Sequence, residues 1–179
     1  MAVFVIIAVL GEDRPGLVEL MSQAIAESGG NWLESRMARL AGKFAGILRA
    51  SIPDAEAEAL GVTLHELEAH GLRMMVEWSA SDEPEPASNL IQLDLIGPDR
   101  PGIIREISHA LAERGVNIDA LHTDSVSAPM SGEPLFKATA LIRTPADVAF
   151  NALQAQLDHL AHELMLDIDL EMVSATSQT

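Results

Sequence analysis

Two similar hexapeptides decide how this chain is organised. They read Gly11-Glu12-Asp13-Arg14-Pro15-Gly16 and Gly97-Pro98-Asp99-Arg100-Pro101-Gly102, and their offset of 86 residues also relates Asn31 to Asn117. A repeat of this length exceeds a solenoid unit and approaches the size of a small domain. The sequence therefore predicts a duplicated domain in which each copy carries the same loop.

The composition allows two small cores. The chain has 179 residues, of which 48% are hydrophobic, so two domains of similar size can each bury a compact core. Domains this small are only moderately stable alone. We therefore expect packing of one copy against another, in the same chain or in a second chain, to add stability.

The charge balance argues against direct binding to nucleic acid. Lys and Arg number 11 against 27 Asp and Glu, and the resulting net charge of −16 repels a phosphate backbone. The basic residues are scattered, and the chain holds no Tyr and only two Trp that could stack on bases.

Cysteine usage and hydropathy indicate a cytoplasmic protein. With no Cys, the chain forms neither disulfides nor thiolate metal sites, and no Cys nucleophile is available. The apolar run at residues 2–10 lacks the basic segment and cleavage site of a signal peptide. No stretch approaches the roughly 20 apolar residues that span a bilayer, so we expect no membrane association.

Each copy begins with an apolar, β-branched run, at residues 3–10 and 90–96, and a glycine follows each run. Such runs are typical of a strand that ends in a turn. After the Pro-Gly pair, apolar residues recur at i, i+1, i+4, i+7 and i+8, which predicts an amphipathic helix. These residues are Leu17, Val18, Met21, Ala24 and Ile25, and then Ile103, Ile104, Ile107, Ala110 and Leu111.

The remainder of each copy predicts two strands, a helix and a last strand. Second strands begin at Asn31 and Asn117, and third strands cover residues 44–52 and 135–143. Pro53 and Pro145 are expected to open the second helices, the later one including Val148, and the last strands cover 72–78 and 165–173. The order β-α-β-β-α-β, found twice, predicts an α+β, ferredoxin-like fold with four antiparallel strands and two helices on one face.

The domain boundaries follow from a polar, proline-bearing segment. We expect the first domain at residues 1–80, a linker at 81–88 and the second domain at 89–174, with the end of the chain frayed. The turn at 125–134 is longer than its counterpart, and we expect it to be mobile or ordered by a partner.

One face of the first strand differs between the copies. Its residues are Phe4, Ile6 and Ala8 in the first copy, and Leu90, Gln92 and Asp94 in the second. The other face is apolar in both copies, as a face covered by helices must be. The extra apolar face in the first copy needs cover, so we expect a homodimer or a larger oligomer.

The repeated loop has the features of a binding site for a small carboxylate. We expect the first glycine to end the strand, the proline to occupy the first helical turn, and the second glycine to admit a ligand close to the backbone. The helix N-terminus then offers free N–H groups and partial positive charge. An alternative is structural: Asp13 and Asp99 cap the helices, Arg14 and Arg100 are solvated or paired with acidic neighbours, and the asparagines tolerate a turn.

The chain resembles the ACT domain, a module that binds amino acids and regulates enzymes and transcription. The resemblance lies in the order strand, Asp-Arg-Pro-Gly, helix, Gly-x-Asn and strand. The resemblance covers nearly the whole chain, and among tandem ACT proteins it extends to the glycine cleavage system transcriptional repressor family. It places the ligand between the loop and the start of the second strand, often at an interface of two ACT domains. The ligand-binding residues it implies are Asp13, Arg14, Gly16, Asn31, Asp99, Arg100, Gly102 and Asn117. The change from Gly30 to Val116 suggests that the two sites differ.

The function expected on these grounds is regulation without catalysis. The resemblance implies a protein that senses a small amino acid, glycine first, and regulates transcription through a partner such as a DNA-binding activator. A regulatory subunit of an enzyme of amino-acid metabolism is the alternative. An enzyme is a third hypothesis, disfavoured because no nucleophile-base set or cofactor loop is visible. His159 and His162 share a helix but are too few to hold a metal, so we expect neither metal nor cofactor.

Overall fold

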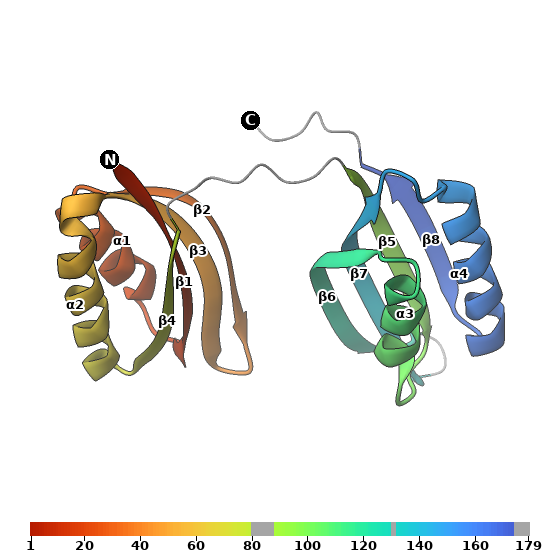
Figure 1. The fold of residues 1–179 in the computed structure, drawn as a ribbon. Coiled ribbons are helices and arrows are strands. Elements are labelled where there is room, and N and C mark those ends of the chain that lie inside the picture. The colour runs from red at the N-terminus through yellow and green to blue at the C-terminus, as the bar shows by residue number, and fades with distance from the viewer. Residues whose placement is uncertain (80–87, 130–131, 174–179) are drawn as a thin grey trace. The chain divides into compact units, whose positions relative to one another are not determined.

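The computed structural model describes residues 1–79, 88–129 and 132–173. Most of the predicted linker, Met130 and Ser131 of the long turn, and the end of the chain from residue 174 lie outside the described residues. The chain divides into two compact units, Met1–Pro84 and Glu85–Thr179 (Figure 1).

The first unit is a four-stranded antiparallel sheet covered on one face by helices. Its elements are β1 (Ala2–Glu12), α1 (Leu17–Glu27), β2 (Asn31–Leu40), β3 (Lys43–Pro53), α2 (Ala57–Leu67) and β4 (Leu72–Ser79), with single 3₁₀ turns, η1 (Asp54–Glu56) and η2 (Glu68–His70), on either side of α2. The strands lie in the order β2-β3-β1-β4, and α1 and α2 lie on the same face (Figure 1).

The second unit repeats this arrangement. It consists of β5 (Ser88–Pro98), α3 (Ile103–Ala112), β6 (Asn117–Ser127), β7 (Pro134–Pro145), α4 (Phe150–Leu164) and β8 (Asp167–Met172), with strand order β6-β7-β5-β8. The predicted α+β fold, the element order and the starts of β2 and β6 at Asn31 and Asn117 are confirmed.

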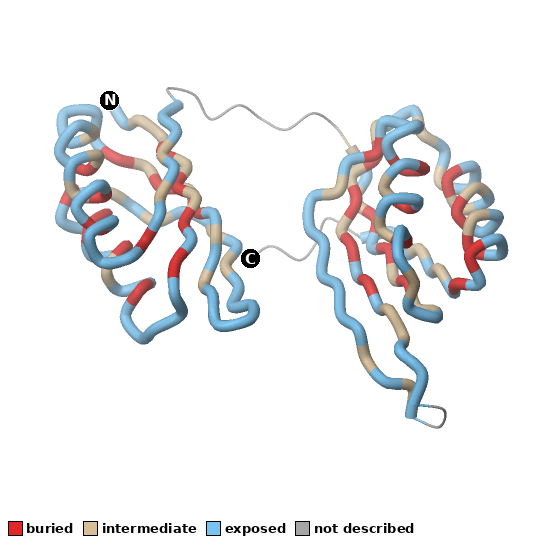
Figure 2. Tube along the Cα trace, turned by 90° about the horizontal axis from the view of Figure 1, so that it is seen from below, coloured by how far each residue is buried: buried red, intermediate tan, exposed pale blue. Residues whose placement is uncertain are grey.

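Alternate residues of the central strand build each core. Val5, Ile7 and Val9 of β1 are buried against the apolar stripes of α1 and α2, and β5 contributes Ile91, Leu93 and Leu95 in the same way. Figure 2 shows the buried residues concentrated where each sheet faces its helices. This distribution is expected because every second residue of a strand, and residues spaced by about 3.6 on a helix, face the same side and can pack against each other.

Four details of the predicted elements are wrong. Pro145 ends β7 instead of opening a helix, and Pro53 ends β3 and caps the 3₁₀ turn η1, so α2 itself begins only at Ala57. A turn, closed by the Val148 N–H donating to the Pro145 carbonyl at 3.1 Å, follows β7, so α4 begins only at Phe150. Met165 precedes β8 with a left-handed backbone, φ 55°.

The fourth detail concerns the first glycine of each loop, which lies within its strand. A Cβ on Gly11 would stand 2.8 Å from Leu72 Cδ2, and one on Gly97 would stand 2.4 Å from Leu166 Cδ2. Close approach of the neighbouring strand therefore requires glycine at both positions, and β1 and β5 continue to Glu12 and Pro98.

The uncovered faces of the two sheets differ as the sequence predicts. On the first sheet, Phe4, Ile6 and Ala8 are half-buried, and Arg49 partly covers the Phe4 ring at 4.7 Å from its centroid. Ile47 and Met75, the β3 and β4 partners of Ala8, remain exposed. On the second sheet the corresponding central residues, Gln92 and Asp94, are polar. Within the described residues, no helix has both the length and the apolar character needed to cross a bilayer.

Candidate ligand-binding site

Each repeated loop leads into its helix through a glycine. Gly16 and Gly102 are the N-cap residues of α1 and α3, with φ of 91° and 96°, and among the described residues no side chain caps either helix by a hydrogen bond. This left-handed conformation explains the second glycine of the motif, because residues with a Cβ rarely adopt it. Pro15 and Pro101 lie outside the helices, which begin at Leu17 and Ile103, so their predicted place in the first helical turn is wrong.

The structural alternative, in which the aspartates cap the helices, is also wrong, because no side-chain hydrogen bond from the described residues caps α1 or α3, and both carboxylates have other partners. In the first domain, Arg39 Nε lies 2.5 Å from Asp13 Oδ2, and the Arg14 guanidinium donates to the carbonyl of His70 at 2.6 Å. The loop is thus tied both to the end of β2 and to the η2 turn before β4. The adjacent Glu12 is paired with Lys43.

The second loop has fewer contacts. The Ser125 hydroxyl donates to Asp99 Oδ2 at 2.9 Å, and Ser125 occupies the repeat position of Arg39. Among the described residues, the Arg100 side chain has no hydrogen-bond or ion-pair partner. Within the part of the chain that the structure describes, the loop of the second domain therefore holds a carboxylate without a cationic partner and a guanidinium without an anionic one.

Acidic side chains stand in the first turn of both helices. Glu19 Oε2 would lie 4.0 Å from a Cβ on Gly16, and Glu106 Oε1 would lie 3.9 Å from one on Gly102. These carboxylates already use the favourable field of the helix dipole. A carboxylate ligand at the helix N-terminus alone would face their negative charge, so an arginine is needed to hold it.

The two asparagines have different surroundings. Asn117 Nδ2 donates to Asp119 Oδ1 at 2.9 Å, and Arg143 contacts Asp119 Oδ2 from Nε at 2.8 Å and from Nη2 at 2.6 Å. Arg143 Nη1 also donates to the Ser88 hydroxyl at 3.1 Å. We call Asn117, Asp119, Arg143 and Ser88 the β6 polar cluster. It fixes the Asn117 amide in one orientation.

The first domain lacks this cluster. Leu33 replaces Asp119 in the repeat, and Asn31 pairs across β2 and β3 with Ser51 where Asn117 pairs with Arg143. Among the described residues, the exposed Asn31 side chain has no hydrogen-bond partner. Its donor and acceptor groups both remain available.

Within one domain, the structure does not bring the loop and the asparagine together. Asn31 lies level with Ser51 and Phe4, near the start of β1, whereas the loop follows Glu12 at the other end. Eight residues of strand separate these levels, about 26 Å at 3.3 Å per residue. The same holds for the second domain, where Asn117 is level with Arg143 and Leu90.

The separation follows from the topology. The strands β1 and β2 run in the same direction because each is antiparallel to β3. A helix that joins two parallel strands returns the chain to the end of the sheet where the first strand began. Sequence reasoning missed this consequence, although the predicted element order already contained it.

The change from Gly30 to Val116 has a packing explanation. A Cβ on Gly30 would lie 2.2 Å from Ile52 Cδ1, so this position is filled by Ile52 in the first domain. The residue equivalent to Ile52 is Thr144, because Ile52 pairs with Val3 of β1 and Thr144 pairs with Asn89, the repeat equivalent of Val3, on β5. A smaller partner makes room for the buried Val116 side chain, so this change is an exchange of volume in the core.

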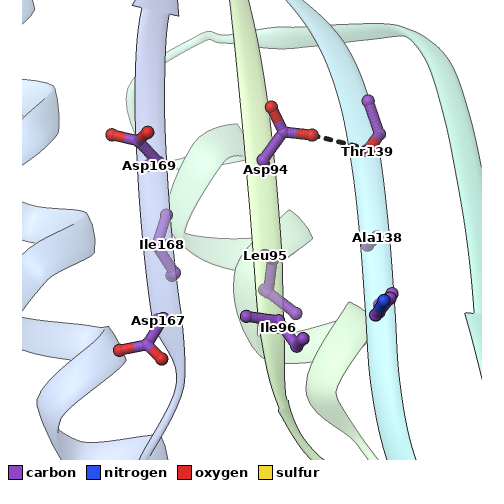
Figure 3. A pocket seen from close by; sticks show the side chains of 9 residues that line it. Asp94, Leu95, Ile96, Ala138, Thr139, Asp167, Ile168 and Asp169 are labelled. Carbon is purple, nitrogen blue, oxygen red and sulfur yellow. Dashed lines mark hydrogen bonds between the residues drawn. The ribbon is translucent and has the colours of Figure 1, made fainter. Parts of the chain in front are cut away.

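A depression of about 380 Å³ lies elsewhere, on the uncovered face of the second sheet. It is bordered by Asp94, Lys137, Thr139, Asp167 and Asp169, among others, and the Thr139 hydroxyl donates to Asp94 at 2.6 Å (Figure 3). None of the eight predicted site residues lines it. No group of three or more His, Asp or Glu in the described part of the chain is arranged to hold a metal ion.

The fold and the repeated loop are those of a known family. Models of the ACT domain match residues 3–79 and 91–155. The chain therefore belongs to the ACT-domain family and carries two ACT domains in tandem. ACT domains are regulatory modules, which agrees with the class of function expected from the sequence.

Two solved structures match almost the whole chain. The crystal structure of an unknown protein from Galdieria sulphuraria has a TM-score of 0.86 and 28% identity, covering 97% of this chain and 100% of the other. A crystal structure provisionally described as a glycine cleavage system transcriptional repressor has a TM-score of 0.72 and 18% identity, covering 97% of this chain and 99% of the other. At 18% identity, the second likeness shows a shared fold. No curated protein sequence matches the chain.

Proposed function

We propose that this protein is a non-enzymatic sensor of a small amino acid, glycine being the first candidate, and that it regulates transcription through a partner protein. The observation that carries the proposal is the pair of ACT domains, each with its own loop and asparagine. The fold shared with the structure provisionally described as a glycine cleavage system transcriptional repressor makes glycine the first ligand to test. Action through a partner is favoured because the net charge of −16 opposes contact with DNA.

The proposed ligand contacts form two kinds of half-site. The loops supply Asp13, Arg14 and Gly16, or Asp99, Arg100 and Gly102, and the second strands supply Asn31 or Asn117. Because a loop and an asparagine of one domain lie at opposite ends of its sheet, one ligand can contact both only if they come from different copies of the domain. Binding that joins two copies also explains regulation, since a ligand shifts an equilibrium only when it favours one arrangement.

Calorimetry of the full chain against each of the twenty amino acids tests the proposal. A ligand as small as glycine has few atoms, so we expect a dissociation constant on the order of micromolar to millimolar. If no amino acid at about ten millimolar produces heat or a shift in melting temperature, the result contradicts the sensor function. Pull-down from native lysate, with and without the ligand, then distinguishes a DNA-binding partner from an enzyme of amino-acid metabolism.

A further inference from the structure

The depression on the uncovered face of the second sheet has a definite arrangement of charged and apolar side chains. Its volume of about 380 Å³ lies in the range of small-molecule pockets, roughly 300–1,000 Å³. All of its residues belong to the second domain. On the uncovered face they form two rows across β7, β5 and β8, first Thr139, Asp94 and Asp169, and then Lys137, Ile96 and Asp167 (Figure 3).

The charges of this depression are not matched by neighbouring side chains. Among the described residues, Lys137, Asp167 and Asp169 have no hydrogen-bond or ion-pair partner. Asp94 accepts hydrogen bonds from two neutral groups, the Thr139 hydroxyl and the Gln92 amide, each at 2.6 Å. These bonds fix the Asp94 carboxylate but leave its negative charge uncompensated. The β5 strand keeps Lys137 apart from the aspartates of β8 by two interstrand spacings, about 10 Å.

We propose that this depression binds a basic amino acid, arginine being the first candidate. The carboxylate of the ligand pairs with Lys137, and its α-ammonium group pairs with Asp94, which lies diagonally across from Lys137. The guanidinium group of the ligand reaches Asp167 and Asp169 on the outer strand β8. This site is separate from the loops and asparagines of the proposed function, and the inference does not depend on them.

The distance between the two ends of the depression selects a long ligand. Glycine carries its ammonium and carboxylate groups side by side, so it cannot reach both Lys137 and the aspartates of β8. A basic amino acid has a stem of three or four methylene groups between its α-carbon and its terminal cation. Ile96 is half-buried between Lys137 and Asp167, and it offers this stem an apolar surface.

The charge of the depression selects a cationic ligand. Three carboxylates stand against one ammonium group, so a ligand with a net positive charge is favoured over a neutral one. Asp167 and Asp169 lie two residues apart on the same face of β8, about 6.6 Å along the strand. A guanidinium group has five donors in a planar fork and can contact both carboxylates, whereas an ammonium group acts as a point charge. Arginine is therefore preferred to lysine.

The first domain lacks this arrangement, although it shares the fold. Ala8 and Met75 occupy the positions of Asp94 and Asp169, and Arg73 occupies the position of Asp167. The site is therefore a property of the second domain, and we expect one basic amino acid per chain. Lys137, Asp167 and Asp169 are exposed, so solvent screens their attraction and the affinity is expected to be modest.

Calorimetry of the full chain with arginine tests the proposal. The titration is made at physiological salt with about ten millimolar glycine present, so that a site that takes glycine is already occupied. We expect one arginine per chain and a dissociation constant on the order of micromolar to millimolar. Norleucine, which has a similar stem without the terminal cation, should give no heat under these conditions.

Two variants on β8 distinguish the depression from a general attraction of cations to an acidic protein. Asp169→Asn should weaken arginine binding about tenfold. Glu171→Gln removes one negative charge from the same strand and face outside the depression, and it should stay within about twofold of wild type. Neither change should alter the response to glycine. Circular dichroism and melting curves check that each variant is folded.

A change at Lys137 gives effects of opposite sign on two ligands. Agmatine has the guanidinium group and stem of arginine but no carboxylate. Lys137→Met should weaken arginine binding about tenfold, because the carboxylate loses its cation. The same variant should bind agmatine more tightly than wild type does, because a like charge is removed from the site.

Three results would overturn this inference. They are absence of heat with arginine at about ten millimolar, equal losses in Asp169→Asn and Glu171→Gln, and the same direction of change for arginine and agmatine in Lys137→Met. Failure of glycine to bind in a separate titration would contradict the sensor function instead. The arginine site would then still be supported by its own titrations.

Discussion

Ile52 lies so close to Gly30 that a Cβ at position 30 would stand 2.2 Å from Ile52 Cδ1. We predict that Gly30→Val destabilises the first domain by about 1–3 kcal/mol, because the added atoms overpack a filled core. Adding Ile52→Thr, which copies Val116 with Thr144, should recover part of this loss. Urea denaturation of the two single variants and the double variant measures the coupling. A double variant as unstable as the sum of the singles would refute the volume exchange.

The backbone conformation of Met165 indicates that a substitution at this position can stabilise the second domain. Its backbone is left-handed at φ 55°, the equivalent Gly71 has φ 82°, and the Met165 side chain is 76% exposed. Met165→Gly should therefore raise the free energy of unfolding of the second domain by about 0.5–1 kcal/mol, since little packing is lost and the backbone strain is relieved. The matched change, Gly71→Ala, should lower the free energy of unfolding of the first domain by about 1 kcal/mol. Chemical denaturation checks both, and a destabilised Met165→Gly would show that buried contacts of this side chain dominate.

The uncovered face of the first sheet predicts self-association. Ile47 and Met75 are exposed on either side of the half-buried Ala8, which makes a short apolar strip across strands β1, β3 and β4. We expect light scattering to give a dimer or larger mass at micromolar concentration, and Ile47→Glu with Met75→Glu to shift it to a monomer. Val62→Glu changes an exposed apolar residue of α2 instead and serves as the control. A wild-type monomer would refute this prediction.

Purified protein should not bind DNA at physiological salt. The net charge of −16 removes the electrostatic attraction that supplies most non-specific affinity. A mobility-shift titration with duplex DNA should show no complex at protein concentrations up to about 10 μM. A complex that weakens as salt is raised would show instead that the protein contacts DNA directly.

Local patterns in the sequence were sufficient for the architecture. The repeated hexapeptide predicted two copies, the helical stripes located α1 and α3, and the alternation on β1 and β5 predicted which strand face the helices cover. These features depend on residues close together in the chain, where periodicity and turn chemistry report directly on structure. The starts of the second helices were harder to predict from the sequence, because Pro53 and Pro145 fit the end of a strand as well as the start of a helix.

The candidate site was predicted residue by residue, but its geometry was not. The sequence by itself determined which residue types recur in both copies: the Asp-Arg pair, the glycine that permits a left-handed N-cap, and the asparagine that begins the second strand. Only the tertiary structure decided that loop and asparagine lie at opposite ends of each sheet, that Arg39 and Ser125 meet the two aspartates, and that Asp119 holds Asn117. The physical reason is that these relations depend on strand order, strand direction and register, which bring together residues that no local pattern connects.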